Sequence, residues 1–207
     1  PRSVKNSVND EAREKLERFA EVKAVRPEKP FTEDELIALL DGCDGYVAGL
    51  DNVTAKVIEN CPQLKVISRW GVGYDKVDTA AASKAGITVT YTPGVMAVSV
   101  AELALGLMLD CARRITVQDG QVRGGAWAPI NGMELFGKTV GIIGYGAIGK
   151  QLGRLTNGIG MTTYAYDPFM NEAYAKEHNV LAADIDFIVR NCDIVSVHVP
   201  YMESTKN

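Results

Sequence analysis

The sequence predicts an α/β protein built from two doubly wound parallel-sheet domains. Short β-branched runs alternate with segments of helical periodicity, a turn at Thr92-Pro93-Gly94 separates two such series, and a glycine-rich turn directly follows one of the strands. The chain has 207 residues, and at about 150 residues per domain this length allows one or two domains. We therefore expect a first domain over residues 1–93 and a second over residues 94–207.

The composition is that of an ordinary globular protein. Hydrophobic residues make up 46% of the chain and charged residues 23%, which excludes a disordered or collagen-like chain. Twenty-two basic residues against 26 acidic ones give a net charge of −4, so we expect no nucleic-acid partner. The four cysteines stand singly, without a CxxC pair, so we expect neither a metal site nor a disulfide framework.

The sequence also predicts no membrane partner. Its most apolar stretch, residues 98–109, is too short to span a bilayer and is interrupted by Glu102. The first five residues, Pro1 to Lys5, lack the apolar segment of a secretion signal. We therefore expect a cytoplasmic protein.

Local signals place the elements of the first domain. Thr32 and Glu35 form a capping box that begins a helix running through Leu40, and Gly42 is suited to end it. An earlier helix is expected within residues 10–20, with Leu16, Phe19 and Ala20 on one face. Strands are expected at 46–48, 64–70 and 87–91. Between them we expect a helix that is capped by Thr54 and runs through Asn60, and a short helix that is capped by Asp78 and stops at Gly86.

The second domain is expected to begin with a long helix. Ser99 and Glu102 form a second capping box, which places the helix from there to about Val117. Because this helix is apolar nearly all round, we expect it to be buried. A glycine-rich loop with Trp127 and Pro129 follows, and then strands at 139–143, 162–166 and 194–199, with helices from Ala147 and near 172–178 and 185–191.

The strongest motif is a GxGxxG turn that follows the strand 139–143 and opens the next helix. Gly144 permits the tight turn, Gly146 lets a pyrophosphate approach the backbone, and Gly149 lets the helix pack against the strand. The free N–H groups of the first helical turn favour an anion there. The spacing therefore predicts a dinucleotide site.

An acidic residue supports this interpretation. Asp167 ends the following strand, 18 residues after Gly149, where a carboxylate accepts hydrogen bonds from ribose hydroxyls and repels a 2′-phosphate. This favours NAD as the cofactor. The alternative is a glycine-rich turn of no special role, with an aspartate that only begins the loop before Pro168.

These residues resemble the family of D-isomer-specific 2-hydroxyacid dehydrogenases, which includes phosphoglycerate dehydrogenase. Four stretches carry the resemblance, in the family's order and over essentially the whole chain. They are Ser68-Arg69-Trp70-Gly71-Val72-Gly73-Tyr74-Asp75-Lys76-Val77-Asp78, Ser99-Val100-Ala101-Glu102, residues 137–149, and Ser196-Val197-His198-Val199-Pro200 with Ser204-Thr205-Lys206-Asn207.

The resemblance implies a flavodoxin-like substrate domain and an inserted Rossmann dinucleotide-binding domain, incomplete here. Gly71-Val72-Gly73 corresponds to the loop whose N–H groups bind the substrate carboxylate, as successive amides in such a turn can do. Arg69 either adds charge to this site or lies on the surface. The cofactor-binding residues implied are Gly144, Tyr145, Gly146, Ala147, Ile148, Gly149, Asp167, Pro168, His198, Val199, Pro200 and Thr205.

The histidines are interpreted with the resemblance in view. His198 matches a segment that lines the cofactor in the family, with structural packing and acid–base chemistry as the alternatives. His178 lies in a charged helical segment and is expected on the surface.

The sequence departs from the family pattern in two places. Met96 stands where many relatives have a polar residue. The family's catalytic arginine, acid and histidine come after the position of Asn207, so we expect no catalytic residue within these 207 residues and no turnover by them alone.

The resemblance implies an NAD-dependent oxidoreductase that transfers hydride between a nicotinamide and a D-2-hydroxy or 2-keto acid, with phosphoglycerate among the candidates. It also implies a homodimer formed through the nucleotide domain, with the helix from Ser99 and the Trp127 loop at the interface. One alternative is a non-enzymatic NAD-binding corepressor of the same fold. A methyltransferase is disfavoured by the spacing to Asp167 and by the Gly71–Gly73 loop.

Overall fold

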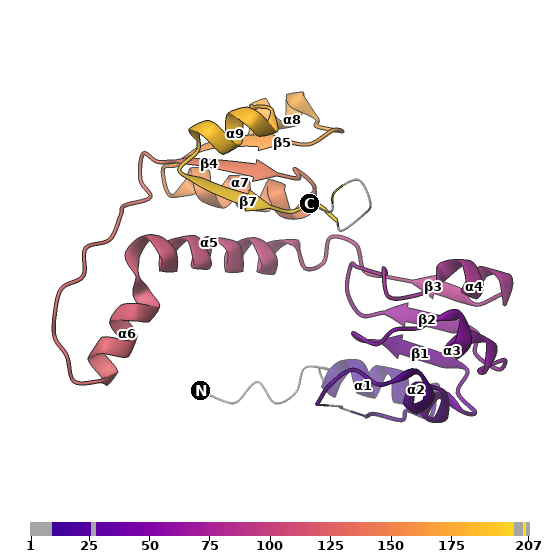
Figure 1. The fold of residues 1–207 in the computed structure, drawn as a ribbon. Coiled ribbons are helices and arrows are strands. Elements are labelled where there is room, and N and C mark those ends of the chain that lie inside the picture. Colours follow the sequence, from indigo (N-terminus) through magenta and orange to yellow (C-terminus); the bar gives the residue numbers. More distant parts are fainter. Residues whose placement is uncertain (1–9, 26–27, 201–204, 206–207) are drawn as a thin grey trace.

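In a computed structural model, which describes residues 10–25, 28–200 and 205, the chain folds into two lobes joined where helix α5 begins (Figure 1). We call residues 10–93 the first lobe and residues 94–200 the second lobe. The expectation for Pro1 to Lys5 lies outside the described residues. Each lobe has its own parallel sheet covered by helices, which confirms the α/β fold class.

The first lobe contains a three-stranded parallel sheet in the order β1-β2-β3. Its register pairs Gly45 with Val66 and Ile67 with Val89. The elements are α1 (Asp10–Glu17), α2 (Glu33–Leu40), β1 (Gly45–Ala48), α3 (Ala55–Glu59), β2 (Val66–Arg69), α4 (Thr79–Lys84) and β3 (Thr88–Thr90).

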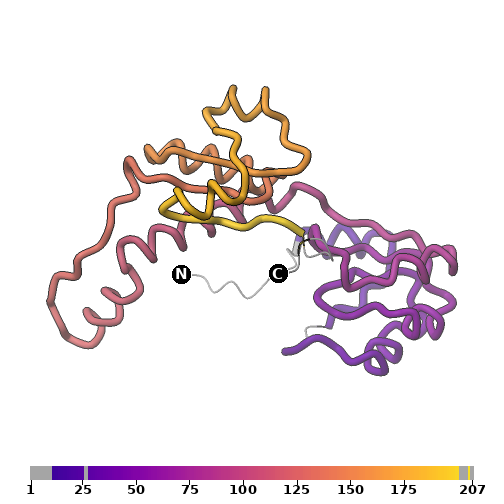
Figure 2. Tube along the Cα trace, turned by 45° about the horizontal axis from the view of Figure 1, so that its top comes forward, coloured from indigo at the N-terminus to yellow at the C-terminus, as the bar shows by residue number. Residues whose placement is uncertain are grey.

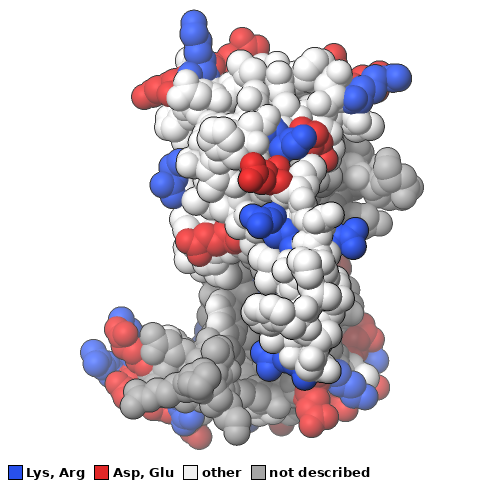
Figure 3. Space-filling model, turned by 90° about the vertical axis from the view of Figure 1, so that its left-hand side faces the viewer, with Lys and Arg blue, Asp and Glu red and all other residues white. Residues whose placement is uncertain are grey.

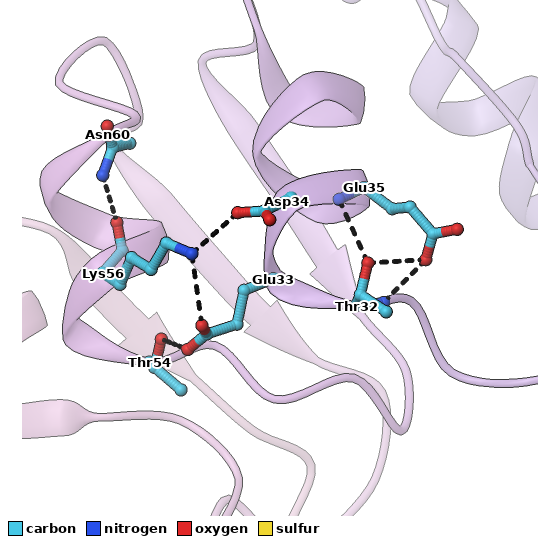
Figure 4. Close-up of polar contacts among 7 residues, drawn as sticks. All are labelled: Thr32, Glu33, Asp34, Glu35, Thr54, Lys56 and Asn60. Atoms are coloured by element: carbon cyan, nitrogen blue, oxygen red, sulfur yellow. Dashed lines mark hydrogen bonds and ion pairs between the residues drawn. The ribbon is translucent and has the colours of Figure 1, made fainter.

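Most of the local signals in the first lobe are confirmed. The Thr32 hydroxyl accepts the amide hydrogen of Glu35, and the Glu35 carboxylate accepts that of Thr32 (Figure 4). These bonds hold the pKa of Glu35 below its ordinary value. Asp78 accepts the Ala81 amide hydrogen and so caps α4.

Two details of the first lobe differ from expectation. The side chain of Thr54 does not cap α3, because its hydroxyl donates to Glu33 in the neighbouring helix (Figure 4). Helix α1 ends at Glu17, and Phe19 lies beyond it with 78% of its surface exposed. Phe19 therefore does not belong to a buried helix face.

The second lobe contains a four-stranded parallel sheet in the order β6-β5-β4-β7, so the strand order reverses at β4. Such a reversal defines a doubly wound sheet and opens a crevice at the carboxyl ends of the two strands that flank it. The elements are α5 (Ala97–Arg113), α6 (Ile115–Arg123), β4 (Thr139–Ile143), α7 (Ala147–Gly158), β5 (Thr162–Tyr166), α8 (Glu172–Glu177), β6 (Val180–Ala182), α9 (Ile185–Asn191) and β7 (Ile194–Val197).

Helices cover both faces of this sheet. Figure 1 shows α9 over one face and α7 with α5 over the other. The α9 side is packed so tightly that a Cβ on Gly141 would lie 2.3 Å from Ile188. The short strand β6 was not expected from the sequence.

The long helix of the second lobe begins earlier than expected. Helix α5 directly follows a turn over residues 93–96, in which Gly94 has a φ of +78°. The Ala97 amide donates to the Gly94 carbonyl at 3.1 Å and so connects the first helical residue to this turn. Ser99 therefore lies inside the first helical turn and cannot cap the helix. The capping box predicted at Ser99 and Glu102 is wrong.

The long helix is also broken. Arg114 adopts a left-handed φ of +54°, and α6 starts at the next residue. Asp110 accepts hydrogen bonds from the amide and the hydroxyl of Thr116 across this break, and these bonds lower the pKa of Asp110. The chain then returns from α6 to β4 through a long loop (Figure 2).

Burial of α5 is one-sided. Ala101 is fully buried, whereas Leu103 and Leu107 are 63% and 56% exposed. The expectation that the helix is buried therefore holds for one face only, the face that packs on α7.

Two separate sets of buried side chains form the cores. The first includes Leu36, Val57 and Ile67, and the second includes Ala101, Val140 and Leu152. The division into domains at residues 93 and 94 falls between these cores and stays a prediction.

Candidate functional site

The turn between β4 and α7 has the backbone that its glycines predict. Gly144 has a φ of +98°, and its amide donates to the Tyr166 carbonyl at 2.8 Å. A Cβ at this position would lie 2.7 Å from the carbonyl carbon of His198. Gly144 therefore lets the end of β4 lie directly against the segment that follows β7.

Gly149 and Gly146 differ in the space around them. A Cβ on Gly149 would lie 2.3 Å from the Gly144 carbonyl oxygen, so only glycine lets α7 pack this closely. A Cβ on Gly146 would meet no atom within 4 Å, because this residue faces open space at the start of α7. The structure thus leaves room for a ligand at Gly146 and none at Gly149.

The start of α7 is suited to an anion. Helix α7 has 12 residues, and no acceptor among the described residues is recorded for the amides of Gly146, Ala147 and Ile148. Free amides at a helix N-terminus, together with the helix dipole, bind phosphate groups. The turn therefore fits the pyrophosphate of a dinucleotide.

Asp167 lies beside the same turn. Its carboxylate accepts the amide hydrogens of Tyr145 and Phe169, each at 2.9 Å, and these bonds fix its position at the end of β5. Each carboxylate oxygen retains a lone pair that can accept a further hydrogen bond. The structure thus brings Asp167 to the glycine turn, as the ribose-binding prediction requires.

Tyr145 faces inward. Its side chain is 3% exposed and packs against the Tyr174 ring, with centroids 6.5 Å apart. Burial raises the pKa of Tyr145 to about 12. The Tyr145 amide donates to Asp167 and its ring packs in the core, so Tyr145 stabilises the turn from the protein interior.

His198 lies in the segment after β7, at the same end of the sheet. Its amide donates to the Ile143 carbonyl at 2.7 Å, and its Nε2 lies 2.9 Å from the Ser196 hydroxyl. Burial lowers the pKa of His198, which favours a neutral ring near pH 7. Such a group is better suited to lining a ligand than to carrying charge.

The remaining residues predicted for this site follow His198. Val199 is half-buried and Pro200 is exposed. The Thr205 hydroxyl donates to the Pro200 carbonyl, whereas Ser204, Lys206 and Asn207 lie outside the described residues. Pro168 is exposed in the turn after Asp167.

The first lobe carries a second turn with free amides, at the end of β2. Gly71 has a φ of +137°; its amide donates to the Arg69 carbonyl and its carbonyl accepts the Thr92 amide at 3.0 Å. Within the described ranges, no acceptor is recorded for the amides of Val72 and Gly73. Two successive free amides form a concave site for a carboxylate.

Arg69 supports this turn. Its guanidinium donates to the carbonyls of Ala48 and Trp70, and it lies against Gly71, where a Cβ would be 3.1 Å from Nη1. The side chain is half-buried. The guanidinium therefore lies at the turn, and the expectation that Arg69 adds charge to a substrate site stays a prediction.

Other charged residues lie apart from these two turns. His178 directly follows α8 as its C-cap and stacks on Tyr174 with ring centroids 4.0 Å apart, so it is more buried than expected. Arg190 lies in the last turn of α9.

The part of the chain that the structure describes contains neither a cluster of metal-ligating side chains nor a helix that could cross a membrane. Within these described residues, no three His, Cys, Asp or Glu side chains lie close enough together to hold a metal ion. None of the described helices combines the length and the apolar character that crossing a membrane requires.

One pair of residues near the first-lobe turn was not expected. Tyr74 and Tyr91 lie 5.2 Å apart between ring centroids, close to Gly73 and to the Thr92 amide. They come from different βα units, and nothing local in the sequence marks them as a pair.

A parallel sheet that reverses at β4, with a glycine turn and an acid beside it, defines a dinucleotide-binding protein. Comparison with known proteins narrows this class. Residues 105–207 match the model of the D-isomer specific 2-hydroxyacid dehydrogenase NAD binding domain. The chain therefore belongs to the D-isomer specific 2-hydroxyacid dehydrogenase family, as its motifs predict.

Individual relatives agree with this assignment. The chain is 34% identical to a glyoxylate reductase of Korarchaeum cryptofilum over 98% of its own length and 63% of that protein, and 36% identical to a D-3-phosphoglycerate dehydrogenase of Methanocaldococcus jannaschii over 99% and 39%. Among solved structures, the TT0316 protein of Thermus thermophilus matches with a TM-score of 0.83 and 32% identity, over 94% of this chain and 63% of that one. The chain thus spans less than two thirds of the length of these relatives.

Proposed function

We propose that this chain is part of an NAD-dependent oxidoreductase that acts on D-2-hydroxy acids and the corresponding 2-keto acids. The observation that carries the proposal is that each lobe has a turn with free amides, one beside Asp167 in the second lobe and one at Val72 and Gly73 in the first. When bound, NAD supplies a nicotinamide that accepts or donates hydride. The residues of this chain bind and orient the reactants.

In this proposal, the second-lobe turn holds the cofactor. The free amides at the start of α7 bind the pyrophosphate, and the Asp167 carboxylate accepts hydrogen bonds from the adenosine ribose. His198, Val199 and Pro200 follow β7 at the same end of the sheet and line the cofactor. Asp167 would repel a 2′-phosphate, which selects NAD over NADP.

The first-lobe turn binds the substrate carboxylate. The amides of Val72 and Gly73 donate to its oxygens, and Arg69 stabilises the turn by binding the carbonyls of Ala48 and Trp70. Fixing the carboxylate orients the C2 atom that exchanges hydride. This assignment is tested by titrating pyruvate into ¹⁵N-labelled protein. We expect the Val72 and Gly73 amide resonances to shift most, and their insensitivity would contradict the proposal.

The 207 residues are proposed to bind these reactants without turning them over. Reduction of a 2-keto acid needs a group that donates a proton to the carbonyl oxygen. The sequence has two histidines: His178 is stacked on Tyr174, and His198 lies after β7 with its Nε2 2.9 Å from the Ser196 hydroxyl, where we propose that it lines the cofactor. NADH oxidation with a panel of 2-keto acids checks this expectation, and turnover by these residues would overturn it.

The second lobe is proposed to associate with another copy of the chain. Helix α6 buries none of its residues, and Leu103, Leu107 and Trp127 are 63%, 56% and 91% exposed. Figure 3, which views the side that carries α6, shows mostly uncharged surface with scattered charges of both signs. Exposed apolar surface of this kind marks an association site. Light scattering of the wild type and of the Leu103→Glu variant tests whether a dimer forms and dissociates.

A cytoplasmic location belongs to the same proposal, and it is supported by the free thiols of all four cysteines. The corepressor alternative is not favoured, since the relatives described above are named as a reductase and a dehydrogenase.

A further inference from the structure

We propose that the first-lobe turn accepts 2-keto acids with an aromatic or large apolar side chain, in preference to short or phosphorylated ones. The inference rests on the proposed function, because it assigns a side chain to the acid whose carboxylate the Val72 and Gly73 amides bind. The names of the two relatives described above refer to two different kinds of acid, a two-carbon acid in one and a phosphorylated acid in the other.

Two aromatic rings stand beside the free amides. Tyr74 directly follows Gly73, and its ring lies 5.2 Å from that of Tyr91, tilted by 56°. The hydrogen bond from the Thr92 amide to the Gly71 carbonyl holds the end of β3 against the turn. The ring pair is therefore fixed next to the atoms that would bind the carboxylate.

These rings belong to a wider apolar surface around the same turn. Trp70, Val72, Tyr74 and Tyr91 are each between 43% and 50% exposed, although they are large and apolar. Single exposed apolar residues are common on protein surfaces, but four around one anion-binding turn offer apolar area to a partner that is charged at one end and apolar at the other. An aromatic or branched 2-keto acid has this shape.

The charges around the turn disfavour a second anionic group. Arg69 already donates to the Ala48 and Trp70 carbonyls, and Lys76 donates to the Leu50 carbonyl at 3.0 Å. The Asp75 carboxylate lies beside Gly73, where Oδ1 would be 2.9 Å from an added Cβ. A phosphorylated side chain needs cations that are free to bind it, and here it would meet a carboxylate.

The experiment measures binding and not turnover. Phenylpyruvate, glyoxylate and 3-phosphohydroxypyruvate are titrated separately into the ¹⁵N-labelled chain, and dissociation constants are taken from the Val72 and Gly73 amide shifts. We expect phenylpyruvate to bind about tenfold more tightly than either of the others. Tyr74→Ala and Tyr91→Ala should each weaken phenylpyruvate binding by about three- to tenfold and leave glyoxylate binding unchanged.

Phe19→Ala provides the matched control, since Phe19 is an aromatic of the same lobe that is 78% exposed and lies outside the turn. It should leave all three constants unchanged. Equal or tighter binding of glyoxylate or 3-phosphohydroxypyruvate at these amides would overturn the inference and leave the proposed function standing. If none of the three acids shifted the two amides, the proposed function would fail together with the inference.

Discussion

The two turns with free amides are built in different ways. In the second lobe, the amides belong to the start of the regular helix α7, and close contacts at Gly144 and Gly149 fix their direction. In the first lobe, the amides of Val72 and Gly73 belong to an irregular turn that is held by Arg69 and by the Thr92 amide. A helix-based site is rigid because its geometry repeats, whereas the turn depends on individual side chains for its shape.

This difference is tested most strongly at two glycines of the second-lobe turn. A Cβ at Gly149 would lie 2.3 Å from a backbone oxygen, which cannot move away without separating α7 from β4. Gly149→Val should therefore lower the free energy of unfolding by about 3 kcal/mol and abolish NADH binding. Urea denaturation and calorimetric titration measure the two effects.

Gly146→Ala is the matched control, because a Cβ there meets nothing within 4 Å. This variant should fold normally and still bind NADH at least about tenfold more weakly, since the methyl group occupies the approach of the pyrophosphate. Unchanged NADH affinity in the Gly146→Ala variant would show that the pyrophosphate lies elsewhere.

A smaller effect on folding is expected at the first-lobe turn. A Cβ on Gly73 would approach only the Asp75 carboxylate, which can rotate away. Gly73→Val should therefore leave the stability within about 1 kcal/mol of the wild type and weaken pyruvate binding by about tenfold or more, with NADH binding unchanged. Normal pyruvate affinity in this variant would refute the carboxylate assignment.

The smallest effect concerns pH. Burial lowers the pKa of His198 in the folded state, so the unfolded state takes up a proton first as the pH falls below about 6.5. The stability contributed by the neutral ring is fully present above that pH and is lost below it. Melting temperatures at pH 7.5 and pH 5.5 should differ less in His198→Asn than in the wild type, and equal differences would show that His198 does not contribute.

The same contrast explains what the sequence could predict. The glycine turn and Asp167 follow one another along a single βα unit, so local spacing was enough to place them together. The Tyr74 and Tyr91 pair depends on the parallel register of β2 and β3, which brings two βα units together, and no short pattern encodes it.

Errors of the sequence interpretation have similar causes. The start of α5 is set by the Gly94 turn, so a capping pattern three residues into the helix was misleading. The break at Arg114 depends on the bonds between Asp110 and Thr116, and the three residues of β6 are too few to show a period. The exposure of Leu103 and Leu107 reflects which face of α5 packs on α7, and an apolar composition does not show this.

Titration of NADH and NADPH into the wild-type chain and its Asp167 variants tests most directly whether the second-lobe turn is a selective NAD site. The wild type should bind NADH at least about tenfold more tightly than NADPH, since a charged hydrogen bond is worth about 1.5–3 kcal/mol. Asp167→Ala should remove this preference. Asp167→Asn, which keeps an acceptor for the Tyr145 amide, should fold normally and also lose most of it. Equal affinity of the wild type for the two cofactors, or an unchanged preference in both variants, would contradict the assignment of Asp167 as the residue that selects NAD.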